Sequence, residues 1–164
     1  MAKPRASIPL LEVENVLPIV SKISLFGGLS EKQLYTVLRL LETVDYDRGE
    51  FIFEAGDAPS EIYIVWQGSV ELVLDAKGSP LAVAVFGVGQ CFGETAVIGI
   101  ERHTAATVAK EDTKLIVLPR EGLFGLWETD KELFGMLVLN IAREACRRLH
   151  RADEAMLHYF ADRR

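Results

Sequence analysis

The residues with the clearest capacity for binding chemistry lie in one short stretch, residues 92–107, which begins with Phe-Gly-Glu and ends with Arg-His-Thr-Ala-Ala-Thr. The carboxylate of Glu94 can accept a hydrogen bond from a sugar hydroxyl, and amide groups at the start of a short helix after it can bind a phosphate. A cation near the end of the stretch can balance the phosphate charge. The stretch is therefore a candidate cradle for a sugar phosphate, with these predicted contact residues: Gly93, Glu94, Thr95, Arg102, His103, Thr104 and Ala105.

The two adjacent basic residues, Arg102 and His103, leave the source of that cation open. An arginine fork binds two phosphate oxygens and keeps its charge, whereas a histidine offers the anion one donor and is a cation only when protonated. Neighbouring side chains in an extended segment point to opposite sides. The alternative is a solvent-facing Arg102 and a His103 without a role, and Glu94 has the alternative role of capping the next helix.

Composition limits the classes of protein to consider. The chain has 164 residues, of which 49% are apolar and 26% are charged, so it is long and apolar enough to fold as one domain without disulfides. Its formal charge of −6 argues against broad binding of DNA, which needs a basic face. We interpret Arg147, Arg148 and Arg151 as the solvated face of a helix. No apolar run reaches membrane-spanning length, and we expect a cytoplasmic protein without a membrane partner.

The spacing of apolar residues divides this domain into three segments, residues 1–42, 43–119 and 120–164. In the first segment we expect a helix over about residues 8–25, and then a helix that begins at a capping box formed by Ser30 and Gln33. In the second segment the period switches to two, with glycines at short intervals. The predicted strands are 43–47, 50–54, 61–66, 69–75, 80–86, 105–110 and 114–118.

Helical spacing returns in the third segment. We predict a short helix over residues 120–128 and a long helix that is capped by Thr129 or Asp130 and runs to about residue 161. A helix of this length extends past a small domain, because it rises about 1.5 Å per residue. The outer part of its apolar stripe therefore predicts a homodimer through an isologous helix pair. That part consists of Ala145, Leu149, Ala152, Met156 and Tyr159.

Several motifs together carry a resemblance to a known family. Glycine landmarks stand at Gly49, Gly56 and Gly68, the triplet Phe-Gly-Glu follows at residues 92–94, and a strand-like segment covers residues 112–119. In this order and spacing they resemble the cyclic nucleotide-binding domain of catabolite-activator-type regulators, cyclic-nucleotide-dependent kinases and gated channels. The resemblance covers about residues 20–150, and residues 92–107 resemble the family's phosphate-binding cassette.

The resemblance implies a fold, a ligand and one departure. The fold would be of the α+β class, mainly β, with an antiparallel β-roll or jelly roll between N-terminal helices and a long C-terminal helix. The ligand would be cyclic AMP, or cyclic GMP because a threonine at the position of Thr104 is associated in the family with a guanine contact. His103 stands where the family has its phosphate-pairing arginine, and Arg102 stands one residue earlier.

We therefore expect a cyclic nucleotide sensor without an attached effector domain, which reports to an unknown effector protein. The alternative is a degenerate domain of the same fold that no longer binds nucleotide and serves protein–protein interaction or dimerisation. An enzyme is not expected, because His103, His150 and His158 cannot be combined into a metal site or a catalytic triad. No metal cofactor is expected either.

Overall fold

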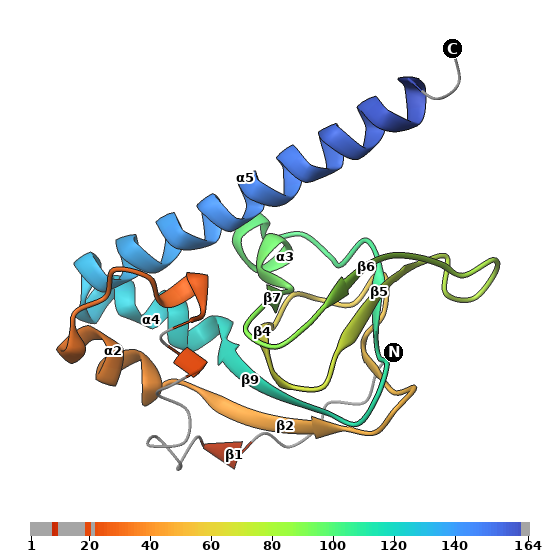
Figure 1. Cartoon of the computed structure of the whole chain (residues 1–164). Coiled ribbons are helices and arrows are strands. Elements are labelled where there is room, and N and C mark those ends of the chain that lie inside the picture. Colours follow the sequence, from red (N-terminus) through yellow and green to blue (C-terminus); the bar gives the residue numbers. More distant parts are fainter. Residues whose placement is uncertain (1–7, 10–18, 21, 162–164) are drawn as a thin grey trace.

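The computed structural model describes residues 8–9, 19–20 and 22–161 of the chain. It consists of two antiparallel sheets, with helices covering one end and a long helix running away from the body (Figure 1). One sheet has the strand order β1-β2-β9-β4-β7 and the other has the order β3-β8-β5-β6. The predicted antiparallel β-roll with flanking helices is thereby confirmed.

Each strand that the sequence predicts is present and lies within one residue of its predicted bounds at either end. These strands are β2 (Glu42–Tyr46), β3 (Phe51–Phe53), β4 (Glu61–Gln67), β5 (Val70–Leu74), β6 (Leu81–Phe86), β8 (Ala106–Ala109) and β9 (Thr113–Pro119). The sequence pattern does not predict β7 (Cys91–Phe92), which pairs with β4 and leads into the candidate cassette. Two residues are too few to show a period.

The core lies in two layers that share strand β4. Ile62 and Ile64 of β4 belong to the cluster between the five-stranded sheet and the helices, whereas Tyr63 and Val65 belong to the cluster between the two sheets. Successive side chains of a strand point to opposite faces, so a strand covered on both sides is apolar throughout. The interior of β4 is buried for this reason.

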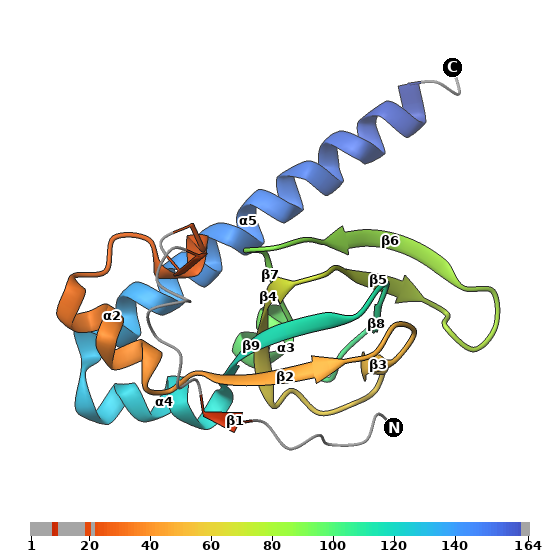
Figure 2. The ribbon, with the colours of Figure 1, turned by 60° about the horizontal axis from the view of Figure 1, so that its bottom comes forward.

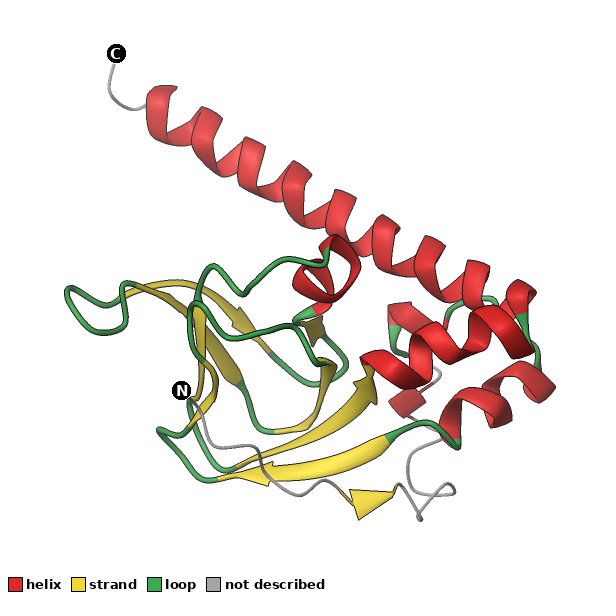
Figure 3. Ribbon diagram, turned by 180° about the vertical axis from the view of Figure 1, so that it is seen from behind, coloured by secondary structure: helices red, strands yellow, loops and turns green. Residues whose placement is uncertain are grey.

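The helices gather at one end of the sheets (Figure 3). They are the 3₁₀ helix η1 (Ser24–Phe26), α2 (Glu31–Leu38), α4 (Arg120–Thr129) and α5 (Lys131–Ala161), while the short α3 (Glu94–Gly99) lies beside α5. The capping box of Ser30 and Gln33 is confirmed, and the cap of α5 is Asp130, whose Oδ1 accepts from the Leu133 amide at 3.0 Å. Within the described residues, no helix combines the length and apolarity needed to cross a membrane.

The expected helix over residues 8–25 is wrong at both of its ends, although Ile19 and Val20 are helical. Residues Ile8–Pro9 form β1, an edge strand that pairs antiparallel with β2, and Ser24–Phe26 form a 3₁₀ turn. Proline has no amide hydrogen to donate to a sheet, so an edge strand is a position that suits Pro9. Residues 10–18 and 21 lie outside the described residues.

Helix α5 contacts the domain from its beginning to Arg148. Buried Asn140 donates from Nδ2 to the carbonyl oxygens of Leu25 and Gly27, at 3.0 and 2.9 Å. Beyond residue 150 the described part of the helix is exposed throughout, and it extends past the sheets (Figure 2). The last part of this helix to contact the domain lies beside the candidate cassette.

Candidate ligand-binding site

The cassette begins at a turn that requires glycine. Gly93 follows β7 with φ +83°, and a Cβ at this residue would lie 3.0 Å from the Glu61 carbonyl oxygen and 3.3 Å from the Tyr63 ring. A side chain is disfavoured there by both the left-handed backbone and the close approach. This turn directs the chain from β7 into α3, so the residues before and after it face one cavity.

A cavity of about 310 Å³ lies against the cassette. The structure brings six of the predicted contact residues to it: Gly93, Thr95, Arg102, His103, Thr104 and Ala105. Its other walls are Phe53, Leu72, Phe86, Phe92, Ala96, Glu101 and Arg148. Glu94 is the one predicted residue that does not line the cavity, and the binding roles of the other six stay predictions.

Glu94 is covered by an arginine from the long C-terminal helix. Its side chain is fully buried, and its Oε1 accepts from Nη1 of Arg148 at 2.7 Å. Nη2 of Arg148 donates to the Cys91 carbonyl oxygen, and the guanidinium lies 4.9 Å from the centre of the Phe86 ring. The other carboxylate oxygen, Oε2, is buried without a hydrogen-bond partner in the described part of the chain.

The environment of Glu94 also sets its ionisation. Burial raises the pKa of the Glu94 carboxyl, and the positive charge of Arg148 opposes that rise. Arg148 itself is shared, because its Nε lies 3.6 Å from Oε1 of Glu144. Arg148 is therefore held by carboxylates on two sides, with the buried carboxylate of Glu94 at the shorter distance.

His103 is part of the wall of the cavity. It is buried, and its ring stacks on Phe53 with the centroids 3.7 Å apart and the planes 16° apart. Its backbone amide donates to the Asp57 carbonyl oxygen at 3.0 Å. Burial lowers the pKa of the His103 imidazole, against the opposite effect of the nearby Asp57 carboxylate. Burial thus favours the neutral form of the imidazole.

Arg102 lies at the exposed rim of the same cavity. Its Nη1 donates to the Gly56 carbonyl oxygen at 2.7 Å, a contact that ties the cassette to the loop after β3. Glu101, which precedes it, also lines the cavity and adds a negative charge. Arg102 is therefore not the freely solvated residue that the alternative interpretation predicted. One of its N–H groups binds the protein and is not available to a ligand in the cavity.

The interpretation of Arg148 as part of a solvated helix face is wrong, although Arg147 and Arg151 are exposed as expected. The contact between Arg148 and Glu94 joins residues 54 positions apart, which no local pattern reveals. One signal was available. Arg148 stands seven residues after the buried Ile141, and seven residues are close to two helical turns. It therefore continues the buried stripe of α5.

Comparison with known proteins identifies the family to which this fold belongs. The family model of the cyclic nucleotide-binding domain matches residues 43–130. The cyclic AMP receptor protein of Thermus thermophilus is 32% identical over 130 residues, which are 79% of this chain and 58% of that protein. Cyclic nucleotide-gated channel beta-3 of Canis lupus familiaris is 31% identical over 116 residues, 69% of this chain but only 15% of the channel.

Solved structures of the same family have the same fold as this chain. The Thermus thermophilus catabolite activator protein superposes with a TM-score of 0.70 at 30% identity, covering 81% of this chain and 61% of that one. A cyclic nucleotide-binding domain from Methylobacillus flagellatus superposes with a TM-score of 0.77 at 23% identity, covering 88% of this chain and 82% of that one. The fold is that of a regulatory rather than a catalytic domain. The chain belongs to the cyclic nucleotide-binding domain family.

Proposed function

We propose that this domain is a sensor that binds cyclic AMP, cyclic GMP or a close relative of them in the cavity beside α3. The observation that carries the proposal is the cavity of about 310 Å³, which has the cassette on one side and Arg148 of α5 on the other. Its volume lies within the range of about 300–1,000 Å³ typical of small-molecule sites. A ligand there would contact the cassette and the long helix together.

In this proposal the cassette residues bind the ribose and the phosphate of the ligand. The Glu94 carboxylate accepts from a ribose hydroxyl once Arg148 moves aside, since Arg148 now occupies one of its oxygens. The amides of Gly93 and Thr95, with Thr104 and Ala105, surround the phosphate position, and Thr104 is the candidate contact for a guanine. Arg102 and His103 stand at the phosphate position but provide little charge there, which favours weak binding.

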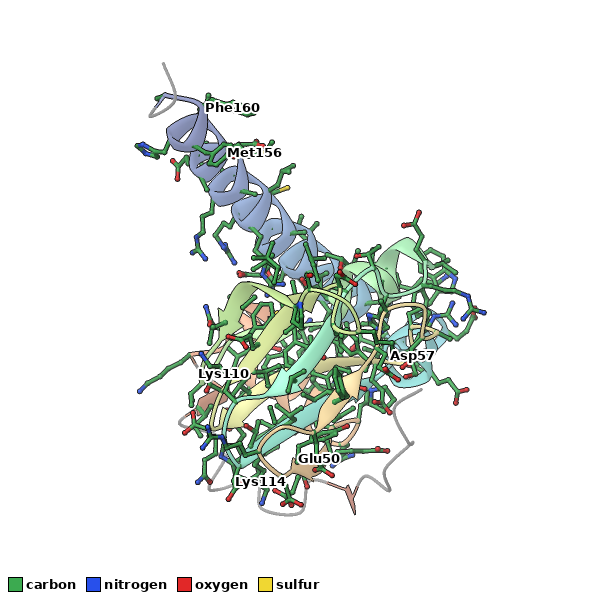
Figure 4. All side chains as sticks on the ribbon, turned by 90° about the vertical axis from the view of Figure 1, so that its right-hand side faces the viewer. Glu50, Asp57, Lys110, Lys114, Met156 and Phe160 are labelled. Carbon is green, nitrogen blue, oxygen red and sulfur yellow. The ribbon has the colours of Figure 1, made fainter. Side chains whose placement is uncertain are left out.

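The output of such a sensor would pass through α5, because Arg148 connects the cavity wall to that helix. Ligand that competes for Glu94 would loosen this connection, and the position of the helix would report occupancy to another protein. We also propose that α5 forms the contact between two copies of the chain. Large apolar side chains are exposed along its outer half, among them Leu149 at 63%, Met156 at 58% and Phe160 at 60%, and Met156 and Phe160 lie well beyond the sheets (Figure 4).

Two observations favour the alternative, a degenerate domain kept for interaction. The carboxylate that would bind ribose is already paired, and the residue in the arginine position is a buried histidine stacked on Phe53. A domain used only for dimerisation needs α5 but not an open cavity.

Calorimetric titration with cyclic AMP and cyclic GMP separates the two functions. The sensor predicts measurable heat and a raised thermal midpoint at millimolar ligand. Thr104→Trp, at the exposed mouth of the cavity, should abolish both, whereas Thr129→Trp, an exposed threonine at the end of α4, should leave both unchanged. If wild type gives neither heat nor a thermal shift, the domain is the degenerate module.

A further inference from the structure

The charged side chains of the cavity determine which ligands it accepts. A cyclic nucleotide carries a negative charge on its phosphate, and such an anion needs a cation or several donors that are not already engaged. Among the described residues that line the cavity, the charged side chains are Glu101, Arg102 and Arg148. Their existing contacts therefore decide whether a phosphate can be neutralised there.

Both arginines donate to protein acceptors, but only Arg148 is paired with a carboxylate. Arg102 donates to the Gly56 carbonyl oxygen, and Arg148 donates to Glu94 and to the Cys91 carbonyl oxygen. If Arg148 turned toward a phosphate, the fully buried carboxylate of Glu94 would lose its cation, and a ribose hydroxyl would replace only the hydrogen bond. A buried charge without a counter-charge is strongly unfavourable, so using Arg148 to bind a phosphate would weaken the binding of the ligand.

His103 adds no charge in their place. Its ring lies against Phe53 and is buried, which favours the neutral imidazole, and the charged group that faces it is the Asp57 carboxylate. Glu101, exposed at the same cavity, would repel a phosphate. The described side chains that line the cavity thus supply little net charge to a phosphate, because Glu101 offsets Arg102 and Glu94 offsets Arg148.

What the cavity does offer suits an uncharged ligand with an aromatic base and sugar hydroxyls. Leu72, Phe86 and Phe92 form an apolar part of the lining. Its polar part includes Thr95 and Thr104, which carry hydroxyls, and Glu101, which carries a carboxylate. Hydroxyl groups donate well to carboxylates, and apolar walls with a few polar groups are typical of small-molecule sites. We infer that the cavity prefers an uncharged nucleoside to the corresponding cyclic nucleotide, an inference that rests on the proposed binding function.

The test is a set of calorimetric titrations of the full chain with matched ligands: adenosine against cyclic AMP, guanosine against cyclic GMP, and 5′-AMP as a more highly charged relative. We expect the nucleoside of at least one pair to bind more tightly than its cyclic nucleotide, and 5′-AMP to bind most weakly. If the cyclic nucleotide binds as tightly as its nucleoside or more tightly in both pairs, the inference is overturned and the proposed function stays intact. No binding by any of these ligands at millimolar concentration would overturn both.

A variant tests the physical reason. His103→Arg restores a cation at the cassette, and a charge-assisted bidentate contact corresponds to about 10- to 100-fold in affinity. We expect the affinity for the cyclic nucleotide to rise by about that factor and the affinity for the nucleoside to change by less than about threefold. His158→Arg, which makes the same substitution on an exposed turn of α5, should change neither. An equal gain for both ligands would contradict the charge argument, and the wild-type series decides the matter if His103→Arg does not fold.

Discussion

The contact between Glu94 and Arg148 makes a strong prediction about stability. Replacing Arg148 by Met keeps much of the side-chain volume but leaves the fully buried Glu94 carboxylate without its cation. Removing one partner of a buried ion pair typically costs about 3–5 kcal/mol. Because the Arg148 side chain is 26% exposed, water can partly replace it. We therefore expect Arg148→Met to lower the free energy of unfolding at pH 7 by about 2–3 kcal/mol.

The assay is urea unfolding at one fixed protein concentration, because self-association would also change the apparent stability. Glu94→Gln removes the charge but keeps the shape of the side chain, so adding Arg148→Met to this variant should cost only about 1 kcal/mol. Arg147→Met is the matched control. Arg147 contacts Glu144 from the exposed side of the same helix, and such a surface pair is worth about 0.5 kcal/mol or less.

The pH dependence of Arg148→Met follows from the direction of the Glu94 shift. Burial raises the pKa of Glu94 in the folded state, so its protonation favours folding below its unfolded pKa, and this contribution is lost as pH rises through the folded pKa. Without Arg148 the pKa should rise further, and the destabilisation should shrink as the pH falls from 7 toward about 4.5. A cost below 0.5 kcal/mol at pH 7, or an equal cost in the Glu94→Gln background, would refute this account of the ion pair.

Three further predictions concern other parts of the domain. Light scattering at micromolar concentration should give about twice the chain mass, and Leu149→Glu should give the monomer; a wild-type monomer would rule out the helix-mediated dimer. Burial lowers the pKa of His103, so its contribution to stability is present above about pH 6.5 and is lost as pH falls through its folded pKa. His103→Phe should therefore flatten this part of the plot of stability against pH. An unchanged plot would show that His103 is not the source of the loss. Gly93→Ala should destabilise the fold by about 2–3 kcal/mol, because residue 93 combines a positive φ with a close contact. Gly56 has φ +91° but nothing within 4 Å of a Cβ at this position, so Gly56→Ala should cost only about 1 kcal/mol. Equal costs would contradict the crowding at Gly93.

Much of the fold could be predicted because its local signals are strong. The alternation of residues and the glycine corners place the strands between residues 42 and 119, and the capping residues Ser30 and Asp130 mark where two helices begin. The secondary structure at the beginning of the chain was harder to predict. An apolar run interrupted by prolines is compatible with both a helix and an edge strand, and only the pairing of β1 with β2 decides between them at Ile8–Pro9.

The candidate site was predictable in its segment but not in its electrostatics. Gly93, Thr95 and Ala105 of the predicted cassette line one cavity, and their binding roles stay predictions. The partners that set the charge of the site come from elsewhere: Arg148 from α5, and the Gly56 carbonyl from the loop after β3. Such long-range contacts depend on tertiary packing, so the sequence could not distinguish a phosphate-binding cassette from one whose cations are already engaged.

The central claim is that the cavity beside α3 is a working ligand site, and amide NMR with isotope-labelled protein tests it most directly. On titration with adenosine or guanosine, the account predicts shifts that saturate and that cluster on residues 93–105 and on the part of α5 around Arg148. Cyclic AMP and cyclic GMP should shift the same signals, with saturation at equal or higher concentration. Spectra that stay unchanged at millimolar ligand, or shifts confined to residues away from the cavity, would contradict the account.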